Sequence, residues 1–72
     1  MNDLKIFIER LVEMRSELGL SQGKLGELVG VSDACVSRWE SGIRIPKADS
    51  IIALCKVLKC SADYLLGLSD EW

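Results

Sequence analysis

Three polar side chains in the middle of this 72-residue sequence can recognise another molecule through hydrogen bonds. Arg38 carries a forked guanidinium that only donates, Asp33 carries a carboxylate that only accepts, and Ser37 carries a hydroxyl that does both. Separations of one and four residues place all three on one side of a helix. Ala34 and Ser41 complete a face without any large apolar residue.

Residues for catalysis or metal binding are scarce. The sequence contains no histidine, and Cys35, Cys55 and Cys60 have no Cys-x-x-Cys spacing. A zinc site would need all three cysteines and a carboxylate, whereas structural zinc sites favour paired cysteine and histidine ligands. No phosphate-binding loop or paired carboxylates indicate a reaction centre. We therefore expect no enzyme activity, no metal and no cofactor, and we interpret the cysteines as free thiols in a reducing compartment.

The apolar spacing predicts that helices position the polar face. Serines suited to N-caps precede three of these helices, and glycines follow most of them. Strand-like alternation is absent, so we expect one all-α domain over residues 1–72, with a core of about 4–68 and a short tail, 69–72. The predicted helices are Asp3–Leu18, Gln22–Val29, Asp33–Ser41, a fourth on the apolar stripe from Ala48 to Leu58, and Ala62–Leu66.

Three glycines fall between the second and third of these helices or inside the second, although each costs roughly 1 kcal/mol in a helix. A small residue at Gly26 lets the second helix approach the following turn, and Gly30 lets the chain leave that helix. Gly23 has no such reason. We interpret it as a tolerated weak point, with close approach of its backbone to a phosphate as the alternative.

The segment LSQGKLGELVGVSDACVSRWESG, residues 20–42, resembles the helix-turn-helix of Cro/cI-type (XRE-like) repressors from phages and bacteria. The resemblance extends from about Leu11 to Leu68, and it implies a compact five-helix lambda-repressor-like fold. The family usually has an acidic residue at Gly23 and alanine at Gly26. The residues that match the motif are Gln22, Leu25, Gly26, Val29, Gly30, Val31, Val36 and Trp39.

By this resemblance the third helix enters the major groove of DNA. Arg38 then suits guanine, Asp33 suits cytosine and Ala34 suits a thymine methyl, although Asp33 equally suits the positive end of its own helix. The residues expected at bases are Gln22, Ser32, Asp33, Ala34, Ser37 and Arg38. Those expected at phosphates, partly through backbone amides of residues 42–44, are Arg15, Lys24, Ile43, Arg44 and Lys47. Those expected to be structural are Arg15, Gly26, Gly30, Val36, Trp39 and Glu40, with Arg15 and Glu40 paired.

The resemblance implies a sequence-specific regulator of transcription, a repressor that binds a pseudo-palindromic operator in double-stranded DNA as a homodimer. Apolar residues near the end are the candidates for the dimer contact, with core packing favoured for Leu65; they are Tyr64, Leu65, Leu68 and Trp72. A net charge of −2 and a pI near 5.0 keep an alternative open, a protein-interaction or antitoxin-like module with the same fold. Salt dependence of DNA binding distinguishes the two, because phosphate contacts weaken steeply with salt.

Location and regulation are less constrained. No apolar run is long enough to span a membrane, so we expect no membrane partner and a cytoplasmic protein, which the resemblance makes bacterial or phage-encoded. Cys35 lies on the expected recognition helix, where a low-pKa thiol can sense oxidants, but a packing role is favoured. An effector or a partner domain outside this chain remains open.

Overall fold

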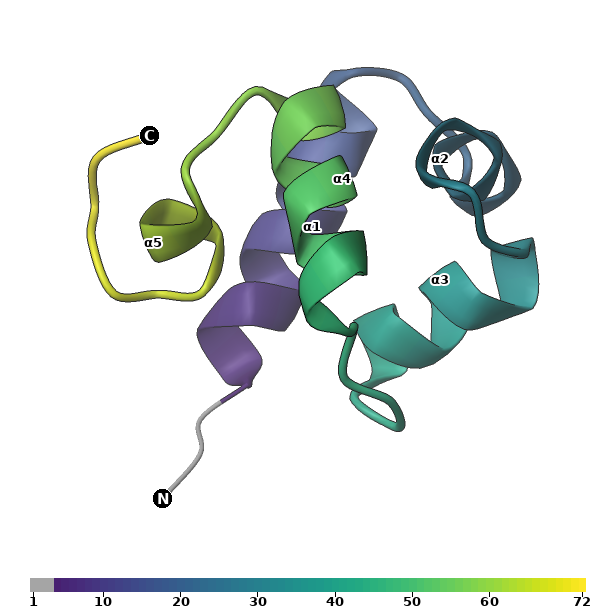
Figure 1. The fold of residues 1–72 in the computed structure, drawn as a ribbon, viewed down its shortest axis with the longest axis horizontal. Helices are drawn as coiled ribbons and strands as arrows, with labels where there is room; N and C mark the ends of the chain where they lie inside the picture. Colours follow the sequence, from purple (N-terminus) through teal and green to yellow (C-terminus); the bar gives the residue numbers. More distant parts are fainter. Residues whose placement is uncertain (1–3) are drawn as a thin grey trace.

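A computed structural model of the chain describes residues 4–72, and Figure 1 shows how its helices are arranged. Every regular element in this part of the chain is helical, so the all-α prediction is confirmed. The helices are α1 (Lys5–Glu17), α2 (Gln22–Val29), α3 (Asp33–Ser41), α4 (Ala48–Leu58) and α5 (Ala62–Leu65).

The predicted bounds hold for α2, α3 and α4 but not for the ends of α1 and α5. Leu18 and Leu66 are C-caps rather than the last helical residues, because the chain turns at Gly19 and Gly67, which both have positive φ. The structure begins α1 at Lys5, and the predicted start at Asp3 lies outside the described residues.

Serine caps begin three of the helices, as the sequence predicts. The hydroxyls of Ser21, Ser32 and Ser61 accept hydrogen bonds of 3.0–3.1 Å from the backbone N–H three residues further on. Each of these bonds satisfies a donor that would otherwise lack a partner at a helix start. Local chemistry therefore fixes where α2, α3 and α5 begin.

A small, mostly aliphatic core joins the five helices. Each helix contributes one side chain that is completely buried, and burying one aliphatic side chain of this size is worth about 1.5–3 kcal/mol. These five residues are Leu11, Leu25, Val36, Leu54 and Leu65. The core interpretation of Leu65 is confirmed, which removes it from the candidate dimer contacts.

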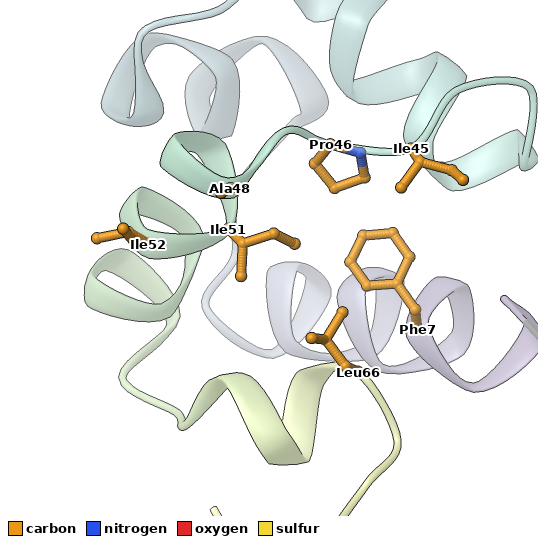
Figure 2. A pocket seen from close by; sticks show the side chains of 7 residues that line it. All are labelled: Phe7, Ile45, Pro46, Ala48, Ile51, Ile52 and Leu66. Atoms are coloured by element: carbon orange, nitrogen blue, oxygen red, sulfur yellow. The ribbon is translucent and has the colours of Figure 1, made fainter.

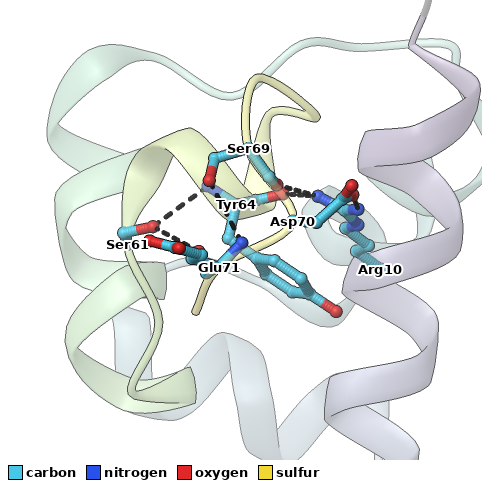
Figure 3. A network of polar contacts seen from close by, with 6 residues as sticks. All are labelled: Arg10, Ser61, Tyr64, Ser69, Asp70 and Glu71. Carbon is cyan, nitrogen blue, oxygen red and sulfur yellow. Dashed lines mark hydrogen bonds and ion pairs between the residues drawn. The ribbon is translucent and has the colours of Figure 1, made fainter.

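The C-terminal tail folds back against α1 and α5, as Figure 3 shows. The guanidinium of Arg10 donates to the carbonyl oxygens of Tyr64 and Ser69 and to the carboxylate of Asp70, and it lies 4.0 Å from the centre of the Tyr64 ring. The ring of Trp72 stacks on the ring of Tyr64, with 5.3 Å between ring centres. Tyr64 is therefore buried, and its expected place in a dimer contact is wrong.

Candidate nucleic-acid interface

The connection between α2 and α3 is so tight that it leaves no room for a side chain at Gly26. A Cβ atom there would lie 2.6 Å from the carbonyl oxygen of Val31 and 3.0 Å from that of Ser32. The N–H of Val31 donates to the carbonyl of Gly26 at 2.8 Å, and Gly30 has a φ of +85°. The predicted close approach is confirmed, and it fixes the direction in which α3 leaves the turn.

Gly23 is different, because a Cβ atom there would meet Asp33 Cβ at an ordinary 3.7 Å. Packing therefore does not require glycine at this position, in agreement with its interpretation as a tolerated weak point.

The two faces of α3 separate as predicted. Val36 and Trp39 are buried in the core, and Cys35 is half-buried at the edge. The outer face presents all five of the expected base-reading residues of this segment to solvent: Ser32, Asp33, Ala34, Ser37 and Arg38. Among residues 4–72 the guanidinium of Arg38 has no protein partner, so its donors are available to a ligand.

A partly buried ion pair ties α1 to the end of α3. Arg15 Nε donates to Glu40 Oε2 at 2.6 Å, and Arg15 Nη2 donates to Glu40 Oε1 at 3.0 Å. Another donor of the same guanidinium reaches the carbonyl of Leu20 at 2.8 Å. The hydrogen bond to Glu40 raises the pKa of Arg15, so the arginine stays charged. The predicted pairing is confirmed, and most of the guanidinium is occupied inside the protein.

Glu40 also accepts a hydrogen bond from Gln22, the first residue of α2. The side-chain amide of Gln22 donates to Glu40 Oε1 at 2.9 Å and is half-buried. Gln22, which was expected at a base, is therefore held by Glu40 rather than free in solvent. The three side chains Arg15, Glu40 and Gln22 form one network that connects α1, α3 and the start of α2.

The loop after α3 uses its amides differently from the expectation. The N–H of Gly42 donates to the carbonyl of Trp39, and those of Ile43 and Arg44 donate to the carbonyl of Arg38, at 3.0–3.2 Å. The last carbonyls of a helix need such donors, and the turn at Gly42 supplies them. These amides are therefore engaged with α3, and the side chains of the loop remain to contact a ligand.

Three cations meet in a groove of about 310 Å³ between α3, this loop and the start of α4. We call it the basic groove. Arg38, Arg44 and Lys47 were each expected at DNA, whereas Asp49 and Ser50 were missed because nothing in their local sequence indicates that α4 begins beside α3. The residues that line it are Val31, Cys35, Arg38, Trp39, Arg44, Ile45, Lys47, Asp49 and Ser50.

Lys24, another expected phosphate contact, is exposed on α2 and pairs with Glu27 at 3.0 Å. An exposed pair of this kind contributes little to stability, so the lysine can exchange Glu27 for another anion. Over residues 4–72 the structure has no helix of the length and apolarity needed to cross a membrane, and it has no group of three or more potential metal ligands.

Comparison with known proteins gives the same architecture. Repressor protein C2 of Salmonella phage P22 is 43% identical over 58 residues, which cover 81% of this chain and 27% of the repressor. The regulator DicA of Escherichia coli is 36% identical over 88% of this chain and 46% of its own length, so the chain spans less than half of either relative. The crystal structure of the P22 c2 repressor with a synthetic operator superposes with a TM-score of 0.84, 38% identity and coverage of 90% of this chain and 98% of that one.

The helix-turn-helix family model matches residues 11–65, which include α2, the Gly30 turn, α3 and the basic groove. That segment contains the close approach at Gly26 and the polar outer face of α3. The chain therefore belongs to the helix-turn-helix family.

Proposed function

We propose that this chain is the DNA-binding domain of a transcriptional repressor, and that it reads a specific operator with α3 in the major groove. The observation that carries the proposal is the outer face of α3, where Arg38 has no partner among residues 4–72 and no large apolar side chain intervenes. The similarity to a repressor solved with its operator supports the same orientation. As a repressor that reads DNA in a bacterial cell, this protein would act in the cytoplasm.

Each side chain receives a role from its place around α3. Arg38 and Ser37 contact base edges, and Ala34 and Asp33 contact the neighbouring base pairs. Ser32 lies at the start of the same helix. Gln22 is held by Glu40 at the edge of this surface, from which it reaches a base or a phosphate. Arg44, Lys47 and Lys24 neutralise phosphates, which positions α3 without reading sequence. Arg15 acts through Glu40 and Gln22.

The experiment that tests this function is selection of bound duplexes from a random DNA library at near-physiological salt. We expect enrichment of a two-fold symmetric sequence, with half-sites about one helical turn apart. Affinity for the selected site should fall steeply with salt, because phosphate contacts release counterions. Absence of enrichment by folded protein, together with weak salt dependence, would instead favour the protein-interaction module.

An Arg38→Ala variant is expected to lose about 1–3 kcal/mol of affinity for the selected site and to lose its preference for one guanine in each half-site. Titration of a fluorescent duplex, with each base pair varied in turn, measures both effects. Lys56→Ala removes an exposed cation of α4 outside the basic groove and serves as the control. If Arg38→Ala weakened all sequences equally, Arg38 would be a phosphate contact instead.

We propose further that two copies of the chain bind the operator together. They contact each other through an apolar groove of about 440 Å³ that lies beside the basic groove. Figure 2 shows Phe7 of α1 facing Pro46 and Ile45 of the loop. Ile45 lines both grooves, so a partner here would lie next to α3 without covering its outer face. The residues that line the apolar groove are Phe7, Ile45, Pro46, Ala48, Ile51, Ile52 and Leu66.

A second copy fits this surface better than another partner does. An interface on a two-fold axis must be complementary to itself. Here the protruding side chain of Ile43, which is 73% exposed, lies in the same loop as the groove.

An Ile52→Glu variant tests this contact, because Ile52 lines the groove and is 57% exposed, so the fold should tolerate the change. We expect it to bind a full operator about tenfold or more weakly and a single half-site normally, since docking would bury an unpaired carboxylate. Leu68→Glu adds the same charge at an exposed residue outside the groove and serves as the control. Sedimentation of one protein per operator would contradict the dimer, and loss of pairing only in Leu68→Glu would place it on the tail.

A further inference from the structure

The end of α4 brings two cysteines together. Cys55 lies in the last turn of α4, and Cys60 follows Lys59, the C-cap, whose φ is +58°. Among the described residues Lys59 is the one non-glycine residue with a positive φ. The N–H of Cys60 donates to the carbonyl of Cys55 at 3.1 Å, so the chain folds back on the helix it has just left. In this type of helix end the two residues so joined commonly pack against each other.

The two thiols are neighbours in this turn. Each lies near enough to the other to shift its pKa, and neither cysteine is in a disulfide. Both side chains are half-buried against the core. Figure 1 places this end of α4 at the opposite end of the helix from the loop that follows α3. Cys35, by contrast, lies on α3 and lines the basic groove.

We propose that Cys55 and Cys60 form a dithiol site that a hydroperoxide oxidises to an intramolecular disulfide. The sulfur of deprotonated Cys55 attacks one peroxide oxygen, the O–O bond breaks, and the other oxygen leaves and takes a proton from solvent to become an alcohol or water. Cys55 is then a sulfenic acid. The sulfur of Cys60 attacks it, the S–O bond breaks, and the hydroxide leaves as water with the proton of Cys60. Two thiols are oxidised to one disulfide while one peroxide is reduced.

The surroundings of each thiol decide which cysteine reacts first. Burial raises the pKa of Cys55, but hydrogen bonding with Cys60 opposes that rise. Burial, with the neighbouring Cys55 adding to it, raises the pKa of Cys60 to about 11. Cys55 is therefore the more readily deprotonated thiol and the first nucleophile, and Cys60 resolves the sulfenic acid. Both remain mostly protonated at neutral pH, so the reaction should accelerate as the pH rises.

The disulfide would join the end of α4 to the start of α5 without involving α3. The residue after Cys60 is Ser61, which caps α5 and whose N–H donates to the carbonyl of Trp72 at 2.7 Å. Because the cross-link holds a turn that is already formed, the oxidised protein should melt at a temperature higher by on the order of 5–10 °C.

The test treats the chain with a modest excess of hydrogen peroxide, followed by peptide mapping by mass spectrometry with and without a thiol reductant. We expect loss of two hydrogen atoms, a linked Cys55–Cys60 peptide that reductant releases, and the higher melting temperature. Cys60→Ser should leave a sulfenic acid on Cys55 that a cyclic diketone traps, whereas Cys35→Ser should change nothing.

Other outcomes would overturn the proposal. Oxidation at Cys35 with Cys55 and Cys60 still free would assign redox chemistry to α3. A sulfenic acid trapped on Cys60 in a Cys55→Ser variant, at the rate seen for Cys55 in Cys60→Ser, would remove the assigned order. A linked form that melts at a lower temperature would mean that the two sulfurs do not lie at bonding geometry in the native fold.

Discussion

An Arg15→Ala variant is expected to lose about 3 kcal/mol of unfolding free energy. The side chains of Arg15 and Glu40 are only 16% and 7% exposed, so removal of the arginine leaves a carboxylate mostly shielded from water. Breaking a buried pair costs about 3–5 kcal/mol, and the residual exposure of Arg15 places the expected value at the lower end. The Leu20 carbonyl also loses its donor.

Urea unfolding followed by the fluorescence of buried Trp39 measures the loss as a lower midpoint. A double variant, Arg15→Met with Glu40→Leu, is the informative control. It replaces both charges with apolar groups of similar size, and it should recover most of the stability because no unpaired charge remains. An Arg15→Ala variant that unfolds at the wild-type urea concentration would show that the pair contributes nothing.

The same variant should also bind DNA more weakly under conditions where it is fully folded. Glu40 accepts from both Arg15 and Gln22, so loss of Arg15 frees the carboxylate to move and with it the amide at the start of α2. The double variant separates the two effects, since it restores stability but leaves Gln22 without its acceptor. Recovery of stability without recovery of affinity is the expected pattern.

The helices of this fold could be predicted from local chemistry, and the contacts of the tail could not. Ser21 and Ser32 cap helices because each hydroxyl reaches an N–H only three residues away, which is visible in any short window of sequence. Arg10 finds its partners 54–60 residues further along the chain. Nothing near Arg10 or near Asp70 indicates that the two would meet, so Tyr64 seemed free for a dimer contact although the folded tail helps to bury it.

The candidate site divides along the same line. The outer face of α3 follows from helical spacing, because Val36 and Trp39 must both point to the core and the remaining residues then point away. The convergence of Arg38, Arg44 and Lys47 depends instead on how the loop returns to α3. That path is set by backbone amides of the loop, which satisfy the last carbonyls of α3 as every helix end requires. The resemblance had assigned these same amides to DNA phosphates.

A Gly26→Val variant is expected to lose about 3 kcal/mol or more of unfolding free energy. The first atom added at Gly26 would lie 2.6 Å from a backbone oxygen of the turn, closer than any tolerated contact, and a backbone oxygen can withdraw only if the turn opens. Overpacking a core typically costs about 1–3 kcal/mol, and here valine adds two further methyl groups at a point that cannot yield locally. The gain from replacing glycine in a helix is at most about 1 kcal/mol.

Gly23→Val makes the same change three residues earlier in the same helix, where the nearest neighbour of an added Cβ, Asp33 Cβ, is an ordinary 3.7 Å away. We expect its stability to stay within about 0.5–1 kcal/mol of wild type, since only helix propensity changes. Gly26→Ala should fall between wild type and Gly26→Val, although alanine is the usual residue of the family at this position, because even a single methyl group meets the turn. Urea midpoints of the variants measure the order, and equal midpoints for Gly23→Val and Gly26→Val would mean that the two helices do not approach as closely as this turn requires.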